Sequence, residues 1–151
     1  MSLRATLLLA AGVFASTVLG GCAPDAPGET PESTLRAFVG AMERSVLDDR
    51  ARAEAFALLD EGSRERLAAR ARRATHLARR PLEPWEMIAP GSFRLRVPLD
   101  PMEIRVDGQR ATIRLQADER TAEVPMVQEE TPDGPRWRLV LVPDDAPEIT
   151  P

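Results

Sequence analysis

Two side chains of this 151-residue sequence stand out by type, because the chain contains one histidine and one cysteine. Histidine is the residue type that changes charge near neutral pH, and it serves as a base or as a metal ligand. His76 follows Leu67 by nine residues, which on a helix places it half a turn away from the apolar face that Leu67 marks. The sequence therefore predicts an exposed His76 without a catalytic or metal-binding role. Cys22 has a different setting, at the end of a long apolar segment.

The acidic residues in the second half of the chain alternate with apolar ones. Glu103, Asp107 and Asp118 fall on the outer face of a predicted hairpin, away from the apolar face. There Glu103 lies diagonal to Arg110 and Arg114, which predicts a solvated ladder of ion pairs. The sequence has no spaced set of metal ligands, no phosphate-cradling glycine loop and no Gly-x-Ser-x-Gly elbow. We expect a domain that is not an enzyme and that holds no cofactor or metal.

The segment before Cys22 has the three parts of an export signal. Residues 1–4 carry one positive charge, and residues 5–18 form an uncharged, mostly apolar run. Residues 19–22, Leu-Gly-Gly-Cys, resemble the bacterial lipobox. This resemblance implies that the chain is cut before Cys22 and that the Cys22 thiol is diacylated. An ordinary cleaved signal and a retained helix stay open as alternatives, although residues 5–22 are fewer than the roughly 20 apolar residues that span a bilayer.

Acylation of Cys22 would bind the protein to a membrane of the bacterial cell envelope through the acyl chains. Ala23 follows the cysteine, whereas an aspartate there commonly keeps lipoproteins at the inner membrane. In a Gram-negative cell we therefore expect outer-membrane localisation, facing the periplasm. Removal of residues 1–21 takes away Arg4 and leaves 19 basic and 24 acidic side chains. This balance argues against a nucleic-acid partner.

The rest of the chain predicts one α+β domain over residues 31–142. A signal peptide (1–21) and a flexible tether (22–30) precede it, and a disordered tail (143–151) follows it. Thr30 fits the N-cap of the first helix, with proline at the first helical position, and Ser63 fits the cap of the third. Helices are expected over residues 31–46, 50–59 and 63–78, and strands over 102–107, 110–117, 122–126 and 137–141.

The apolar spacing also predicts turns and packing. Asp107-Gly108 is expected as the two-residue turn of a hairpin, and Pro125 suggests a strand at an edge or a bulge. Residues 131–134 are expected to turn the chain into the last strand. On the first helix Val46 belongs to the predicted apolar stripe. The expected core places four residues of the strands, Ile104, Ile113, Leu115 and Leu139, against Phe38, Val39 and Met42 of that helix.

Segments within residues 31–142 resemble the nuclear transport factor two-like, or SnoaL-like, superfamily, and in particular its small bacterial lipoproteins. They are TLRAFVGAM, ALLDEGSRERL, MEIRVDGQRATIRL and RWRLVL. The resemblance implies N-terminal helices packed on a curved antiparallel sheet of about four strands, in the shape of a cone. Enzymes of the superfamily carry acids, histidines and often tyrosines inside the cone. This chain has no tyrosine and predicts apolar residues there.

A Pro-containing connection between the helices and the strands holds candidates for an apolar ligand pocket. Trp85, Met87 and Phe93 lie in it and are expected to line the mouth of the cone. The sequence equally allows these side chains to pack in the core or at its rim.

The third helix carries the densest positive charge of the chain. Arg66, Arg70 and Arg73 form one row on the helical wheel. Guanidinium groups pair with the phosphates and carboxylates of lipid headgroups and cell-wall polymers, so we expect contacts to an anionic surface. A solvated helix face is the alternative, because all 20 basic residues of the chain are arginine.

Three hypotheses for the function follow. The first is an envelope lipoprotein whose non-catalytic domain binds a partner protein, an anionic lipid or the cell wall, or supports envelope structure. The second is a module that binds an apolar small molecule in the cone. The third is a SnoaL-like enzyme. A filled apolar interior favours the first hypothesis over the other two.

Substitution of Cys22 by alanine is expected to leave an unprocessed precursor without lipid, because the acyl acceptor is lost. Intact-mass measurement of the wild-type and C22A proteins checks this. A wild-type protein that is cut at another site and carries no lipid would contradict the lipobox interpretation.

Overall fold

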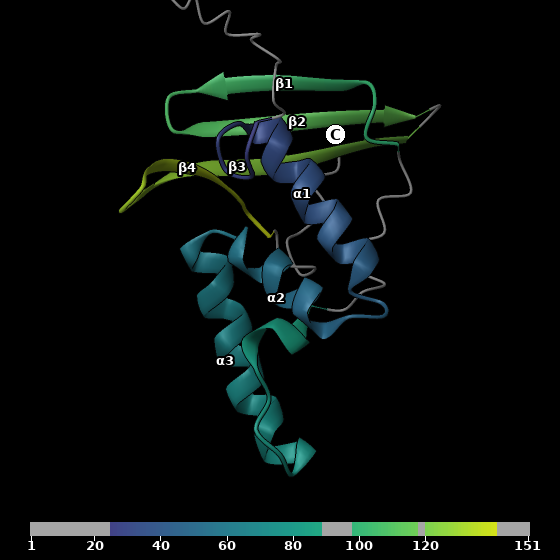
Figure 1. Ribbon diagram of the computed structural model, residues 1–151, viewed down its shortest axis with the longest axis vertical. Helices are drawn as coiled ribbons and strands as arrows, with labels where there is room; N and C mark the ends of the chain where they lie inside the picture. Colours follow the sequence, from purple (N-terminus) through teal and green to yellow (C-terminus); the bar gives the residue numbers. More distant parts are fainter. Residues whose placement is uncertain (1–24, 89–97, 118–119, 142–151) are drawn as a thin grey trace, which may run out of the picture.

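The computed structural model describes residues 25–88, 98–117 and 120–141 of the chain (Figure 1). Three helices and one four-stranded antiparallel sheet, with strand order β1-β2-β3-β4, confirm the predicted α+β class. The helices are α1 (Pro31–Arg44), α2 (Asp49–Ala57), α3 (Glu61–Ala78) and the 3-10 turn η1 (Pro84–Met87). The strands are β1 (Met102–Asp107), β2 (Arg110–Ala117), β3 (Arg120–Thr131) and β4 (Gly134–Leu139).

The start of α1 is the one predicted from the sequence. The Ser33 N–H donates to the Thr30 hydroxyl (3.1 Å), and the Thr30 N–H donates to the Ser33 hydroxyl (3.2 Å). This reciprocal pair is a capping box, and it satisfies N–H groups that the first turn of a helix leaves free. The end of α1 differs from the prediction: the helix stops at Arg44, and Val46 is 58% exposed rather than buried.

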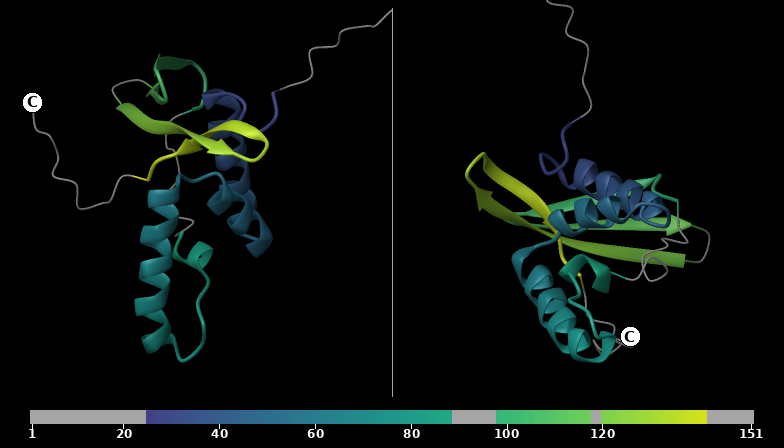
Figure 2. Two further views of the ribbon diagram at one scale, coloured as in Figure 1. Left: turned by 90° about the vertical axis from the view of Figure 1, so that its left-hand side faces the viewer. Right: turned by 60° about the horizontal axis from the view of Figure 1, so that its bottom comes forward.

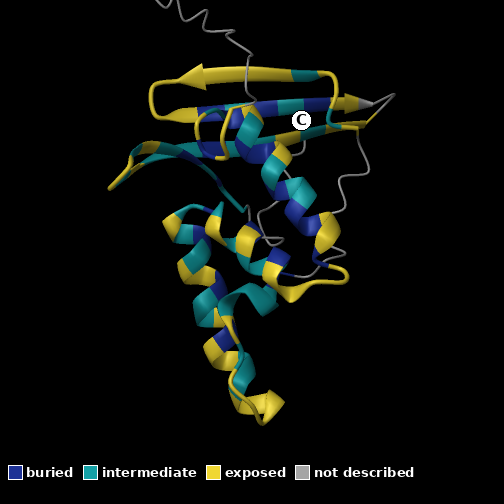
Figure 3. Cartoon of the chain, in the orientation of Figure 1, coloured by how far each residue is buried: buried dark blue, intermediate teal, exposed yellow. Residues whose placement is uncertain are grey.

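The core lies between α1 and the inner face of the sheet. Phe38 and Met42 of α1 pack in one cluster with Ile113 and Leu115 of β2, as predicted. The expected burial of Ile104 is wrong, because its side chain is 36% exposed. The reason is coverage: among the strands, α1 contacts mainly β4 and β2. Strand β1 lies outside that cover, as its exposed colouring shows (Figure 3). The buried apolar residues of the strands are Ala111, Ile113, Leu115, Met126, Trp137 and Leu139.

The first hairpin is shifted by one residue from the prediction. Asp107 pairs with Arg110, so its turn consists of Gly108 and Gln109. Only Gly108 has a positive φ there, of 57°, a conformation that glycine adopts without steric cost. Moving the turn by one residue changes the pairing by two, so Arg114 lies directly opposite Glu103 instead of diagonal to it. Because side chains alternate with a period of two, every side chain stays on its predicted face.

Pro125 lies in β3, an inner strand of the sheet, and not at an edge as expected. Its carbonyl accepts a hydrogen bond from the Val140 N–H (2.9 Å). The N–H and C=O of one residue in an antiparallel strand point to the same side, so the nitrogen of Pro125 also faces β4. Since β4 ends at Leu139, the proline removes no hydrogen bond from either ladder.

The domain begins earlier than the boundary at residue 31. Gly28 is buried with a φ of 92°, and its carbonyl accepts a hydrogen bond from the Trp137 N–H of β4 (2.8 Å). The Ser33 hydroxyl donates to the Ala26 carbonyl (3.0 Å). Residues 26–30 therefore form a turn docked on the sheet, and they are not part of a free tether.

The connection between α2 and α3 is also docked on β4. The Leu139 N–H donates to the Leu58 carbonyl (2.9 Å), and the Asp60 N–H donates to the Leu139 carbonyl (3.0 Å). Leu59 forms an isolated parallel bridge with Leu139, and its side chain is fully buried. This junction sets the point at which α3 leaves the sheet.

Truncation of Ile113 to alanine is expected to lower the free energy of unfolding by about 2–5 kcal/mol, because the side chain is fully buried. The matched change Ile104→Ala, on the paired residue of β1, should cost about 1 kcal/mol or less. Urea unfolding of both variants measures the difference. Equal losses at the two positions would contradict the burial described for β1.

Candidate functional site

Helix α3 extends away from the sheet along the longest axis of the molecule (Figures 1 and 2). The predicted cap at Ser63 is wrong: Asp60 is the N-cap, and its carboxylate accepts from the Ser63 N–H (3.1 Å). The carboxylate of Glu129 on β3 accepts from the Glu61 N–H (2.7 Å) and lies 3.4 Å from Arg64. Two carboxylates thus satisfy N–H groups at the positive end of the helix.

One face of α3 is covered, and η1 packs closely against the helix. Ser63, Leu67 and Ala71 are buried on this face, which is the apolar face that Leu67 marks in the sequence. Thr75 also belongs to the packed side, because its hydroxyl accepts a hydrogen bond from the Leu82 N–H (3.0 Å). His76 is exposed, as its position on the helical wheel predicted. The exposed residues in the second half of the helix are Arg70, Arg72, Arg73, His76, Leu77 and Ala78.

The predicted apolar pocket is only partly described. Trp85 and Met87 lie on η1 and are half-buried, and Met87 packs against the core cluster. Phe93 lies outside the described residues. Met87 therefore contacts the core, and a ligand pocket formed by Trp85, Met87 and Phe93 stays a prediction.

Several arginines of this region are held by neighbours. Arg64 pairs with Glu129, and Arg80 donates two hydrogen bonds to Glu86 (3.1 and 2.6 Å). These bonds, with one from the Glu83 N–H, lower the pKa of Glu86 to about 2. Both pairs neutralise a guanidinium locally, so neither arginine is available to an external anion.

Arg66 also has partners within the chain, and in this it differs from Arg70 and Arg73 of the predicted row. Its guanidinium donates to the Leu141 carbonyl (2.8 Å) and to the Ser63 hydroxyl (2.9 Å). The same hydroxyl accepts from the Leu141 N–H (2.9 Å). Arg66 thus fastens α3 to the chain just after β4.

Four other arginines of this region have no partner among the described residues. Arg70, Arg72 and Arg73 lie on α3, and Arg79 follows it in a left-handed conformation (φ 57°). All four are exposed, and no hydrogen bond or ion pair joins them to another described residue. We call these four residues the free arginine set.

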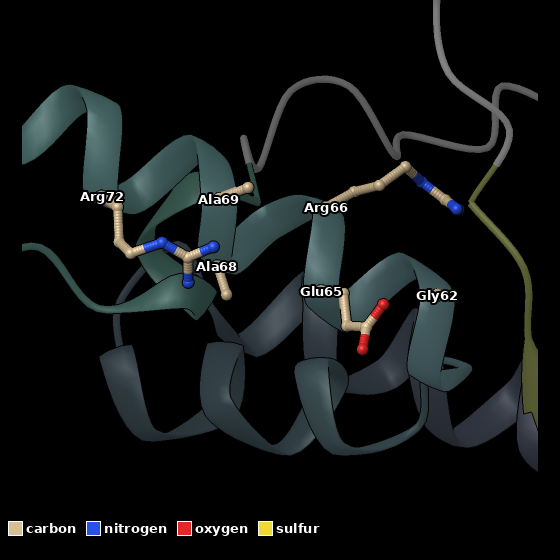
Figure 4. A pocket seen from close by; sticks show the side chains of 6 residues that line it. All are labelled: Gly62, Glu65, Arg66, Ala68, Ala69 and Arg72. Carbon is tan, nitrogen blue, oxygen red and sulfur yellow. The ribbon is translucent and has the colours of Figure 1, made fainter.

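A surface hollow of about 560 Å³ lies along α3 (Figure 4). Ala68 and Ala69 lie between Arg66 and Arg72 along the helix, and all four residues line the hollow. A guanidinium donates paired, charge-assisted hydrogen bonds to a carboxylate or a phosphate. The other residues that line the hollow are Gly62 and Glu65. Because Arg66 is held by Leu141 and Ser63, Arg72 is the guanidinium that this shallow hollow offers to an anion, in the same lining as the carboxylate of Glu65.

The sequence predicted the helix and two members of the free arginine set, Arg70 and Arg73. It placed Arg72, which lines the hollow beside the alanines, on the other side of His76 and not in the predicted row. The signal was present, because Arg72 follows Ala68 and Ala69 by four and three residues, the spacing of neighbours on a helix.

Three further features of the sequence analysis are Cys22, the metal ligands and a membrane-spanning helix. Cys22 lies outside the described residues. Within the described ranges, no three His, Cys, Asp or Glu side chains are grouped as metal ligands would be. In the same ranges, no helix has the length and apolar character needed to cross a membrane.

Comparison of the chain with models of known protein families, with curated proteins and with solved structures gives no match.

Replacement of Arg66 by alanine is expected to lower the free energy of unfolding by about 1 kcal/mol, because it removes hydrogen bonds of a charged group to Leu141 and Ser63. Arg70→Ala should change it by less than about 0.5 kcal/mol. Chemical denaturation of both variants gives the comparison. If Arg70 proves as costly as Arg66, the division between held and free arginines is wrong.

Proposed function

We propose that this chain is a lipid-anchored protein of the bacterial cell envelope whose small, non-catalytic domain binds the anionic cell wall through α3. Two features support the proposal: the export-signal and lipobox pattern that ends at Cys22, and the free arginine set. The anchor keeps the protein at a membrane, and the helix carries the contact surface. In a Gram-negative cell this membrane would be the outer one, with the domain in the periplasm.

The observation that carries the binding proposal is the contrast in charge pairing. Nine arginines of the described residues form ion pairs with glutamate or aspartate. In a chain with a net charge of −4, carboxylates are plentiful. Yet Arg70, Arg72, Arg73 and Arg79, on and just after α3, form no ion pair with a carboxylate among the described residues. An uncompensated cluster of guanidinium groups is an anion-binding surface.

The position of the anchor favours a target away from its own membrane. The described chain starts beside the sheet, whereas the C-terminal end of α3 lies at the opposite end of the molecule (Figures 1 and 2). Cys22 precedes Asp25 by three residues, a reach of about 10 Å at most. The arm of α3 alone is about 27 Å long. A lipid at Cys22 would therefore hold the sheet near the membrane and direct the free arginine set into the compartment.

The non-catalytic character of the domain is supported by the chemistry of its interior. The inner face of the sheet presents Ile113, Leu115 and Met126, all buried, to α1. We further propose that α1 and this sheet are the helix and curved sheet of the nuclear transport factor two-like, or SnoaL-like, cone. The order of elements and the position of α1 over the inner face support this assignment.

Sedimentation with insoluble cell-wall fragments tests the binding proposal. The full-length chain, purified in a non-ionic detergent, is expected to bind the fragments at low ionic strength and to be released by salt. The double variant Arg70→Glu, Arg73→Glu should bind at least about tenfold more weakly, a loss of about 1.4 kcal/mol. Its thermal midpoint should stay near that of the wild type, because neither side chain has a partner to lose.

The control changes the net charge equally at another place. Arg50 and Arg110 are exposed and their side chains have no described partner, so Arg50→Glu, Arg110→Glu should leave the binding unchanged. If both double variants bind the cell-wall fragments equally weakly, the loss comes from the net charge alone. That result would contradict a binding site on α3. Binding of the wild type to anionic phospholipid vesicles but not to cell-wall fragments would assign the surface to lipid headgroups instead.

A further inference from the structure

The two outer edges of the sheet differ in how they are closed. Along β4, the Trp137 N–H donates to Gly28, and both backbone groups of Leu139 bond to the connection between α2 and α3. Along β1, the only described strand partner is β2. An uncovered edge strand is a template for another strand. The free edge of β1 is visible at the top of Figure 1.

The hydrogen-bond pattern shows which residues of β1 have free backbone groups. The Gln128 N–H of β3 donates to the Gln109 carbonyl (2.8 Å), so the odd-numbered positions of β2 face β3 and the even-numbered ones face β1. On β1 the partners of these even-numbered positions are Glu103 and Arg105, whose backbone groups therefore point to β2. Outward-pointing N–H and C=O groups remain at Met102, Ile104 and Val106.

The side chains of these outward-bonding residues extend the apolar inner face of the sheet. Ile104 and Val106 are 36% and 57% exposed, although they lie opposite the buried Ile113 and Ala111. The inner face thus continues to β1, where Ile104 and Val106 stay exposed. A second strand placed there would bury both side chains and bond the free backbone groups at once.

We propose that β1 pairs antiparallel with β1 of a second copy of this chain, about a two-fold axis at Ile104. In this register Ile104 meets Ile104 of the partner, and Met102 meets Val106. On the outer face Glu103 meets Arg105, and by symmetry Arg105 meets Glu103. The strand sequence Met-Glu-Ile-Arg-Val-Asp is therefore complementary to itself in apolar character on one face and in charge on the other.

Neighbouring symmetric registers lack this complementarity. A two-fold axis at Arg105 would place Arg105 opposite its own copy and Glu103 opposite Asp107. An axis at Glu103 would place two copies of Glu103 opposite each other. Like charges directly opposite across two strands are destabilising, so the side chains select the register centred on Ile104. Because a single six-residue strand is a small interface, we expect a weak dimer whose population rises with concentration.

The test is the mass of the full-length chain in a non-ionic detergent, measured by light scattering with the detergent contribution subtracted, over a concentration series. The wild type should pass from monomer to dimer. Ile104→Lys should raise the dissociation constant at least about tenfold, because it places two charges at the two-fold axis. Leu77→Lys, on an apolar residue of α3 that is 87% exposed, is the matched control and should leave the dimer unchanged.

Charge variants give a second readout that a folding defect cannot imitate. Glu103→Arg and Arg105→Glu should each be monomeric, since each places like charges opposite each other across the axis. An equal mixture of the two variants should form a heterodimer, because one chain then carries two positive charges on this face and the other two negative. A wild type that stays monomeric throughout, a dimer that survives Ile104→Lys, or a mixture without heterodimer would overturn the proposal. None of these outcomes depends on the anchor or on the free arginine set.

Discussion

The junction between Leu139 and residues 58–60 determines the shape of this molecule. Both backbone groups of Leu139 are bonded to the connection between α2 and α3, and its side chain is buried in the core. Leu59 is fully buried at the same place. Because Asp60 caps α3 and its N–H also bonds to Leu139, the start of the helix is attached to the sheet at its first turn. The rest of α3 extends from this point, and the surface that it presents follows from it.

The junction separates two surfaces with different charge patterns. On the sheet, Arg105, Arg114, Arg136 and Arg138 pair with carboxylates, whereas Arg110 and Arg120 have no described ion pair. On the projecting part of α3, the free arginine set has no such match among the described residues. The proposed anchor at Cys22 lies on the sheet side, and the proposed binding surface lies on the helix side. The open edge of β1 belongs to the sheet side as well, so pairing through it would leave the arginines accessible.

Local sequence chemistry predicted most of the elements, and contacts between distant segments account for the errors at Ile104 and Arg66. The N-cap at Thr30 needs only neighbouring residues, and it was predicted. The burial of Ile104 depends on which strand α1 covers, and the pattern of β1 alone does not contain this information. Arg66 seemed equivalent to Arg70 and Arg73 on the helical wheel, but its partner Leu141 is far along the chain. The helix was thus predictable, whereas the division of its arginines into held and free required the tertiary structure.

Amide hydrogen exchange at Asp60 and Leu139 tests the junction most directly. If the junction holds α3 to the sheet, both amides should exchange only with global unfolding, with a protection free energy within about 1 kcal/mol of that of the Ile113 amide in β2. An Asp60 amide that exchanges like a frayed helix end, while Ile113 stays protected, would show that α3 moves independently of the sheet. That result would contradict the fixed presentation of the arginine surface.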